Sequence, residues 1–457
     1  MAIFKKGASE FATPYTVKDA VIKGGLATKL SMIIMGFGNV AHKQFMKGLL
    51  YFAIELAYIL FMVQTGIGCL QDLISLGGNP PEEFWNEAKG IFEYTKGDMT
   101  ILFLLYGVAT IFLTIAFVIV WRANMKSAYE CECLKKAGKH INNISEDIKA
   151  LFDKKLQYTL LSAPIMGIII FTILPLVFMI CMAFTNYSKI GDHLTIFEWV
   201  GLDSFGTVLG MGNSIGQTFW SVLGWTIVWA IFATFLNYIL GMLLAMVINR
   251  KTTRCKGFWR FCFMLSAAIP QFVSLLLMRT LLKDNGLINV MLQNAGWINS
   301  PLPFLTDATW ARVVVIVINL WVGIPFTMLQ VTGILQNIPT ELYEAARVDG
   351  ANAVTIFFKI TLPYMLFVTT PYLITTFTGN INNFNVIYLL TGGAPVPVGS
   401  TAGKTDLLVT WLYKLTIDYQ YYNVGAVVGI MTFVILAIVS LITYRNTGSY
   451  KNEEGFQ

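Results

Sequence analysis

The sequence predicts an all-α polytopic membrane protein. Of its 457 residues, 56% are hydrophobic and only 13% are charged, whereas a soluble domain carries about 25% charged residues. Apolar runs of about 20 residues recur along the chain, and each is long enough to cross about 30 Å of hydrocarbon as a helix. The basic residues behind the net charge of +6 lie in short loops between these runs. We therefore expect membrane lipid around the chain and no nucleic-acid partner.

We expect about eight transmembrane helices, because the apolar runs are separated by polar or turn-forming segments. The predicted spans cover residues 45–67, 100–121, 158–183, 218–248, 259–283, 310–333, 364–390 and 423–444. The expected organisation is a cytoplasmic segment over 1–44, two accessory spans with a cytoplasmic linker over 45–157, a transmembrane core over 158–445 and a cytoplasmic tail over 446–457.

The distribution of basic residues predicts the orientation of the spans. Residues 250–260, after the fourth span, contain five basic residues and no acid, whereas residues 68–99 contain six acids and only two lysines. Cytoplasmic loops carry the excess of Lys and Arg. We therefore expect a multi-pass membrane protein with both termini in the cytoplasm, and the polar segment 339–363 on the same side.

The linker of residues 122–157 contains the one grouping that resembles a metal site. Cys131 and Cys133 are separated by one residue and His140 follows. This spacing fits no standard zinc pattern and a fourth ligand is missing. We therefore expect a solvated linker here and no metal site.

The segment 339–363 is charged although it joins two apolar spans. Thr340 is suited to begin a helix as its N-cap and Gly350 to end it, which predicts a helix of about ten residues, roughly 15 Å long. Ala345 and Ala346 are small enough for another surface to approach closely, and Glu344 offers a charge. A second helix is expected from about residue 353, so the segment forms a helix–turn–helix attached to both spans.

This segment resembles a known motif. The pattern Glu344-Ala345-Ala346, three residues, Gly350, nine residues, Ile360, one residue, Leu362-Pro363 is similar to the EAA loop of binding-protein-dependent ABC importer permeases. Residues 199–205 also resemble a segment that precedes the core spans of sugar permeases, with Ser204 in place of the usual Asn. Residues 256–445 are similar to the maltose/maltodextrin permeases of that family.

The resemblance implies a type I ABC importer permease core and several partners. These are a second homologous permease subunit, two cytoplasmic ATPase subunits that bind ATP and Mg, and an extracytoplasmic sugar-binding protein. The EAA loop would be a coupling helix that docks into the ATPase. The implied coupling residues are Glu344, Ala345, Ala346, Asp349 and Gly350. Some family members carry a large domain after the third span, but this loop covers only about 184–217 here.

The seventh span is rich in threonine and asparagine, which marks it as a candidate sugar site. Thr376, Asn380 and Asn383 repeat at i, i+4 and i+7, so they share one face of a helix. Buried amides need hydrogen-bond partners; a sugar can supply them, and so can neighbouring helices. The resemblance implicates further residues, namely Asn319, Val322, Gly323 and Phe326 on the sixth span and Ala267 and Gln271 on the fifth.

The resemblance implies import of maltose- or maltodextrin-like oligosaccharides across a bacterial cell membrane by alternating access. Ala267 and Phe326 stand where a related permease has tyrosines, so a wider cavity is expected.

The segment 399–405 is one residue too short for a phosphate-binding P-loop. We therefore expect no ATP site, no cofactor and no catalytic residue in this chain.

The main alternative is an ion-coupled secondary transporter that uses Glu55. An acid inside a span is a functional candidate by default. However, the other predicted membrane interiors carry almost no ionisable groups, so a structural role for Glu55 is favoured. A membrane-embedded enzyme is a weaker alternative, because the three histidines fall in three separate loops.

The orientation can be tested by cysteine labelling of intact cells with a membrane-impermeant reagent. Single cysteines introduced in 68–99, 184–217 or 391–420 should react, because these loops are predicted to be external. Cysteines in 122–157 or 336–362 should react only after the membrane is opened. Labelling of 340–350 from outside would contradict the coupling role of that segment.

Overall fold

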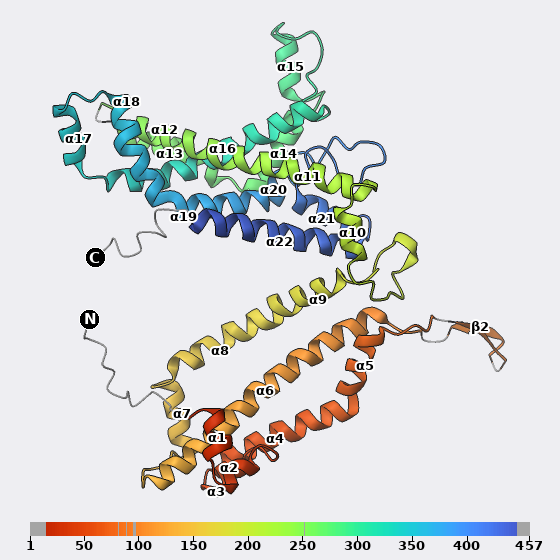
Figure 1. Ribbon diagram of the computed structural model, residues 1–457. Coiled ribbons are helices and arrows are strands. Elements are labelled where there is room, and N and C mark those ends of the chain that lie inside the picture. Colours follow the sequence, from red (N-terminus) through yellow and green to blue (C-terminus); the bar gives the residue numbers. More distant parts are fainter. Residues whose placement is uncertain (1–14, 81, 88, 95–96, 251, 446–457) are drawn as a thin grey trace. The chain divides into compact units, whose positions relative to one another are not determined.

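Long apolar helices make up most of the computed structural model, which describes residues 15–445 except 81, 88, 95–96 and 251 (Figure 1). Within the described residues, seven helices are long and apolar enough to cross a membrane, and a bent pair of helices is an eighth candidate. The predicted all-α membrane class is therefore confirmed. The predicted tail 446–457 and the first 14 residues lie outside the described residues.

The chain forms two compact units, which are described separately. The first holds the described residues up to 187 together with 192–199. Its elements are α1 (Val17–Lys23), α2 (Leu26–Leu30), α3 (Phe37–Ala41), α4 (Phe45–Phe61), η1 (Met62–Gly66), α5 (Ile67–Ser75), β1 (Glu83–Asn86), β2 (Ile91–Tyr94), α6 (Thr100–Lys136), α7 (Ile144–Phe152), α8 (Leu156–Ile168), η2 (Ile169–Ile173) and α9 (Leu174–Met182). The antiparallel hairpin of β1 and β2 lies in the loop 68–99, where no strand was expected.

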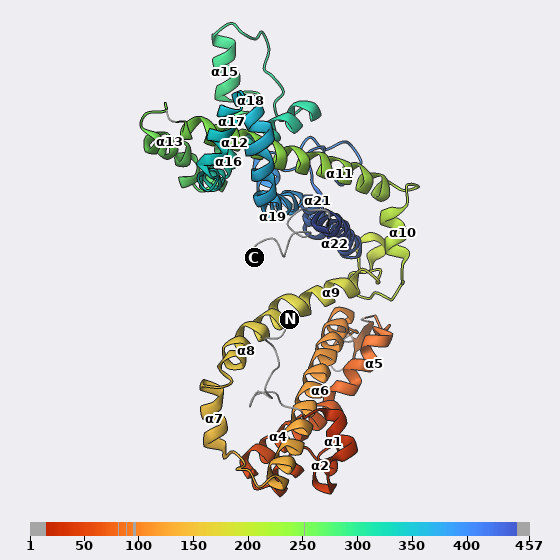
Figure 2. The same cartoon turned by 60° about the vertical axis from the view of Figure 1, so that its left-hand side comes forward.

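In the first unit, buried polar groups of α4 and α6 bind the short helices α1 to α3 and the loops between them. The Glu132 carboxylate accepts hydrogen bonds from the backbone N–H of Gly25 and the hydroxyl of Thr28. The amide of Asn124 accepts the N–H of Gly36 at 2.8 Å. Figure 2 shows α1 and α2 beside the end of α6. These bonds satisfy backbone groups that lie outside regular helices.

Glu55 belongs to the same set of contacts. Its side chain is buried, and Oε2 accepts the backbone N–H of Met35 at 2.8 Å. The carboxylate is therefore occupied in fixing the N-terminal segment, as a structural role requires.

The prediction of a solvated linker over 122–157 was wrong for its first part. Helix α6 continues through Lys136, and Cys131 is buried with its thiol 3.1 Å from Oε1 of Gln44. Asn124, Ser127 and Glu132 of this stretch are buried and bind the N-terminal segment, whereas its lysines are exposed. Composition alone does not distinguish the two groups and therefore indicated a solvated segment.

The second unit holds 188–191 and the described residues from 200 onward. Its elements are η3 (Ile190–Asp192), α10 (Asp203–Leu209), α11 (Ser214–Ile231), η4 (Phe232–Leu236), α12 (Asn237–Asn249), α13 (Lys256–Ala268), α14 (Gln271–Leu281), α15 (Leu287–Asn294), α16 (Ala308–Gln336), α17 (Thr340–Val348), α18 (Ala353–Ile356), η5 (Phe357–Thr361), α19 (Leu362–Ile381), α20 (Phe384–Leu390), α21 (Leu408–Ile417) and α22 (Tyr422–Arg445).

Two predicted spans of this unit are interrupted. The fifth, expected to be continuous over 259–283, consists of α13 and α14 with a bend of 82° between them. Ile269 and Pro270 are extended at the bend, because proline removes a backbone donor and disfavours helix in the residue before it. The seventh, expected over 364–390, breaks after Ile381 and resumes at Phe384.

Four of the long spans in the described chain contain one turn of π-helix, namely η1, η2, η4 and η5. Such turns are rare and often occur at functional sites. In the second unit, η4 joins α11 to α12, and η5 joins α18 to α19. The second helix of the 339–363 segment therefore runs without a break into the seventh span.

The role of Glu55 can be tested by comparing Glu55→Ala with Glu55→Gln in the purified, detergent-solubilised chain. Alanine leaves the N–H of Met35 unpaired, which should cost about 1–3 kcal/mol of unfolding free energy. Glutamine keeps an oxygen acceptor and should unfold close to the wild-type temperature. If neither change affected thermal unfolding but both abolished transport, the alternative of ion coupling through Glu55 would be favoured.

Candidate functional site

A polar cavity of about 150 Å³ lies between α12, α16 and α19 in the second unit. Five of the predicted sugar-site residues line it, namely Asn319, Gly323 and Phe326 from α16 and Thr376 and Asn380 from α19. Thr234 of η4 and Asn237 and Tyr238 of α12 complete much of the wall. Amide, hydroxyl and aromatic groups thus converge from helices that are far apart in the sequence.

Close contact between α12 and α16 positions one side of this cavity. A methyl group on Gly323 would lie 2.7 Å from Nδ2 and 2.8 Å from Oδ1 of Asn237. One turn further along both helices, the glycine belongs to α12 and the polar side chain to α16. A methyl group on Gly241 would lie 2.7 Å from Cβ of Thr327. Each helix therefore presents a glycine to a polar side chain of the other, which lets the two backbones approach closely.

Asn380 fixes α19 to the helices opposite. Its Nδ2 donates to the hydroxyl of Thr234 at 2.9 Å, and its backbone carbonyl accepts from Nε1 of Trp229 at 3.0 Å. Tyr238 and Thr369 share a further hydroxyl–hydroxyl bond of 2.7 Å between α12 and α19. The amide donor of Asn380 is thus engaged by a neighbouring helix, whereas the residue still lines the cavity.

The remaining predicted sugar-site residues do not line this cavity. Asn383 was expected on the face of Thr376 and Asn380, but the helix ends at Ile381. Asn383 instead caps α20, where its Oδ1 accepts the N–H of Val386. Ala267 and Gln271 lie on either side of the bend between α13 and α14, and Val322 is also absent from the wall. A face deduced from helical period holds only while the helix continues.

Asn237 is the main site residue that the sequence analysis missed. Its side chain is buried, Nδ2 donates to the carbonyl of Ala233, and Oδ1 has no hydrogen-bond partner among the described residues. A buried acceptor without a partner is costly. The available signal was a single asparagine within the long apolar fourth span, a weaker signal than the threonine- and asparagine-rich span that contains Asn380.

The charged segment between α16 and α19 has the expected helix and turn. Helix α17 covers Thr340–Val348, with Pro339 rather than Thr340 at the N-cap position. Gly350 has φ of +75°, a conformation that favours glycine. Glu344 and Ala345 are exposed, as are Asp349 and Gly350, whereas Ala346 is half-buried.

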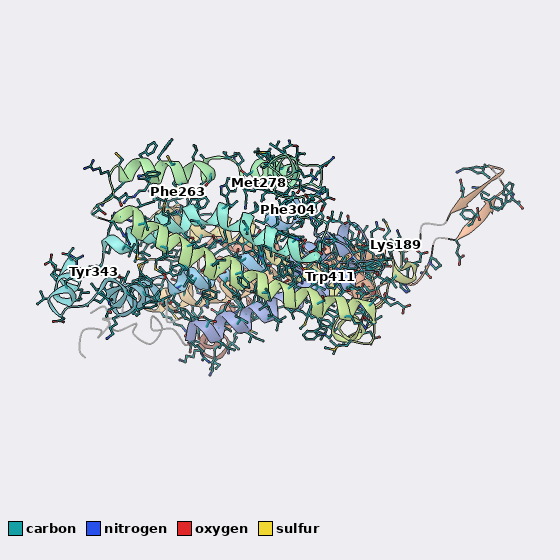
Figure 3. The ribbon with its side chains drawn as sticks, turned by 90° about the horizontal axis from the view of Figure 1, so that it is seen from above. Lys189, Phe263, Met278, Phe304, Tyr343 and Trp411 are labelled. Atoms are coloured by element: carbon teal, nitrogen blue, oxygen red, sulfur yellow. The ribbon has the colours of Figure 1, made fainter. Side chains whose placement is uncertain are left out.

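Helix α17 is attached to the bundle through its inner face. Ile338, just before it, is buried in a core cluster that also contains Tyr238, Met328 and Met365. The hydroxyl of Tyr343 lies 3.2 Å from that of Thr361, which belongs to η5. Figure 3 shows Tyr343 and Trp411 at opposite ends of the second unit. The exposed charges of α17 are therefore carried on a helix that contacts the base of α19.

The segment 399–405 forms part of the loop between α20 and α21. The backbone N–H of Gly403 donates to Oδ2 of Asp406 at 2.7 Å. This amide, which a P-loop would turn toward a phosphate, binds the chain's own carboxylate.

The sequence is similar to sugar permeases over nearly its whole length. A family model described as "Binding-protein-dependent transport system inner membrane component" matches residues 237–447. The galactooligosaccharides transport system permease protein GanP of Bacillus subtilis is 34% identical over 430 residues, covering 93% of this chain and 98% of that protein. The maltodextrin transport system permease protein MdxF of the same organism is 33% identical over 453 residues, covering 96% and 99%.

A solved structure shares the fold. It is a bacterial ABC transporter involved in the import of the acidic polysaccharide alginate, with 23% sequence identity and a TM-score of 0.51 over 65% of this chain and 96% of that chain. With the near full-length relatives, these findings define the class: the chain belongs to the family of permease subunits of binding-protein-dependent ABC sugar importers. The resemblance noted from the EAA motif is thereby confirmed.

The contact between α12 and α16 can be tested with two glycines of the same helix. Gly323→Ala should displace the side-chain amide of Asn237 from its bond to the carbonyl of Ala233 and destabilise the purified chain by about 1–3 kcal/mol, the usual range for overpacking. Gly333→Ala is the matched control, because a methyl group there would meet no atom within 4 Å. Thermal unfolding measures both variants. Equal melting temperatures for the two would contradict the close approach at Gly323.

Proposed function

We propose that this chain is the subunit through which a maltodextrin-like oligosaccharide crosses the membrane by alternating access. The observation that carries the proposal is the polar cavity between α12, α16 and α19. Asn319, Thr376 and Asn237 offer amide and hydroxyl groups that match sugar hydroxyls, and Phe326 offers an apolar ring at the edge. The names of the two Bacillus subtilis relatives refer to galactooligosaccharides and to maltodextrin, which supports an oligosaccharide as the substrate class.

The proposed complex contains a second homologous permease subunit, two cytoplasmic ATPase subunits that bind ATP and Mg, and an extracytoplasmic sugar-binding protein. This chain would supply no ATP site of its own. A cavity of about 150 Å³ is below the usual range of about 300–1,000 Å³ for ligand sites. A cavity shared with a second permease would provide the missing wall and volume.

The coupling step is assigned to α17. Its exposed Glu344 would face a basic residue of an ATPase subunit, while Tyr343 and Ile338 hold the helix against the bundle. Closure of the ATPases would move α17, and the continuous helix from Ala353 to Ile381 would transmit that movement to Asn380 and Thr376. Both termini of the chain would lie on the cytoplasmic side with α17.

Transport can be tested in proteoliposomes that contain the complete complex, with maltotriose uptake and ATP hydrolysis measured together. Thr376→Val removes one hydroxyl from the cavity and should weaken apparent sugar affinity by about 2- to 12-fold, the equivalent of a hydrogen bond worth about 0.5–1.5 kcal/mol. Thr375→Val is the control on the same helix, because Thr375 is exposed and does not line the cavity. Equal effects of the two would show that the sugar site is misplaced.

The same preparation tests coupling. Glu344→Lys should abolish both uptake and sugar-stimulated ATP hydrolysis, because it brings like charges together. Glu344→Gln should retain part of both activities. Normal activity of Glu344→Lys, or uptake driven by a proton gradient without ATP, would contradict the proposal.

A further inference from the structure

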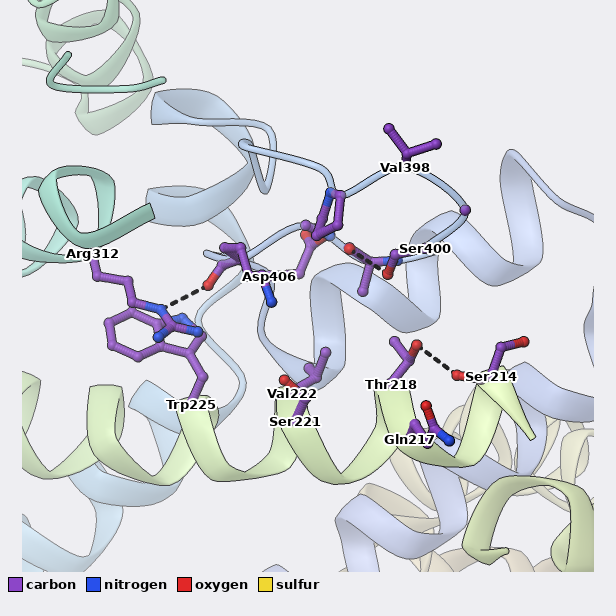
Figure 4. A pocket seen from close by; sticks show the side chains of 15 residues that line it. Ser214, Gln217, Thr218, Ser221, Val222, Trp225, Arg312, Val398, Ser400 and Asp406 are labelled. Atoms are coloured by element: carbon purple, nitrogen blue, oxygen red, sulfur yellow. Dashed lines mark hydrogen bonds between the residues drawn. The ribbon is translucent and has the colours of Figure 1, made fainter. Parts of the chain in front are cut away.

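A second cavity, of about 280 Å³, lies between the first turns of α11, the first turns of α16 and the loop 391–407 (Figure 4). We call it the loop pocket. It is lined by Ser214, Gln217, Thr218 and Ser221 of α11, by Arg312 of α16 and by Lys404 of the loop. Trp411 packs beneath this loop and donates to Thr401, so the loop pocket lies at the opposite end of the second unit from Tyr343 (Figure 3). The loop pocket shares no lining residue with the cavity between α12, α16 and α19, and no residue of α17 lines it.

Buried polar groups of the loop 391–407 form hydrogen bonds within the loop and with Lys414 of α21. Asp406 is completely buried, and its carboxylate lies 2.6 Å from Nζ of Lys414 and also accepts the N–H of Gly403. The hydroxyl of Thr405 donates to the carbonyl of Ala394. Asp406 is the only acid in the wall of the loop pocket, and it is already paired with Lys414, which lies outside the wall.

Two cations of the loop pocket remain without an acid. Arg312 lies with Cζ 4.6 Å from the ring centre of Trp225, and its Nε donates to the carbonyl of Lys404 at 2.9 Å. These contacts fix the guanidinium plane and leave its two Nη groups without an acceptor among the described residues. Neither Arg312 nor Lys404 forms an ion pair within the part of the chain that the structure describes.

The face of α11 that lines the loop pocket is polar although the helix belongs to a long apolar span. Ser214, Thr218, Ser221 and Trp225 follow at helical spacing, and Figure 4 shows them along the side of α11 that faces the loop. The hydroxyl of Thr218 donates to the carbonyl of Ser214 at 2.7 Å, whereas the hydroxyls of Ser214 and Ser221 have no partner among the described residues. Beside two cations that lack an acidic partner, these two hydroxyls create a site for a negatively charged group. They would stabilise the oxygens of a carboxylate that Arg312 holds with two parallel hydrogen bonds.

The loop pocket is less suited to a sugar ring. The only aromatic side chain in its wall, Trp225, is 7% exposed, and Arg312 covers its ring. A sugar ring would therefore find no free aromatic face, whereas a carboxylate on a side chain would find a fixed guanidinium.

We propose that the loop pocket binds the carboxylate of an acidic side chain of a protein that docks on this end of the permease. The inference rests on the proposed function only in assigning that protein to the extracytoplasmic side, where the sugar-binding protein would arrive. Charge complementarity of this kind fixes the register of an interface and speeds association. The carboxylate site itself can be measured without transport.

The experiment uses the purified chain in nanodiscs of zwitterionic lipid and two blocked amino acids, N-acetyl-glutamate amide and N-acetyl-glutamine amide. Titration by saturation-transfer NMR should show at least about tenfold tighter binding of the glutamate compound, because only it carries the charge. Arg312→Gln should reduce that binding about tenfold, and Lys404→Gln by a smaller factor. Lys283→Gln removes an equal charge outside the loop pocket and should leave binding unchanged.

Three results would overturn the proposal. The first is equal binding of the glutamate and glutamine compounds, and the second is equal loss of binding in Arg312→Gln and Lys283→Gln with unaltered thermal unfolding. The third is tenfold tighter binding of glucuronate than of the glutamate compound, which would assign the loop pocket to an acidic sugar instead. If maltotriose uptake failed in the reconstituted complex while the glutamate compound still bound through Arg312, only the transport proposal would be lost.

Discussion

The contact between α12 and α16 is the constraint on which the candidate site depends. Gly323 faces Asn237, and Gly241 faces Thr327, so each helix has a small residue where the other has a polar one. In hydrocarbon, helices gain little from burying apolar surface against one another, and close packing with a few polar contacts holds them together. The contact of Gly323 with Asn237 also places the buried amide of Asn237 at the wall of the cavity. The same residues therefore pack the two helices and supply polar groups to the candidate site.

The polar groups of the second unit divide into those that join helices and those that face the cavity. Thr234 and Tyr238 bind Asn380 and Thr369 across the bundle, which satisfies groups that would otherwise be costly in a membrane. Several other threonines of α19 donate to carbonyls of their own helix, as Thr370 does to Leu366. A threonine-rich span is therefore compatible with a lipid environment, and only the members on the cavity side carry chemical information about a substrate.

Composition and charge pattern were sufficient to predict the membrane class and the approximate spans, because bilayer thickness fixes the length of an apolar helix. The cavity residues Asn319 and Gly323 were predicted through the family resemblance, whereas Asn380 was predicted from its helical spacing to Thr376 as well. The break after Ile381 moved Asn383 out of the site, and the bend at Pro270 separated Ala267 from Gln271. Asn237 was missed because its importance arises from a packing partner, Gly323, that lies 86 residues away in the sequence.

The helix from Ala353 to Ile381 connects the end of the bundle beside α17 to the wall of the cavity. It measures about 43 Å at 1.5 Å per residue, and a tilt of about 10° about one end would displace the other by about 7 Å. One end includes η5, whose Thr361 contacts Tyr343, and the other end carries Asn380. In the proposed coupling step, a tilt caused by a movement of a few ångströms at α17 would therefore be sufficient to change the shape of a cavity deep inside the bundle.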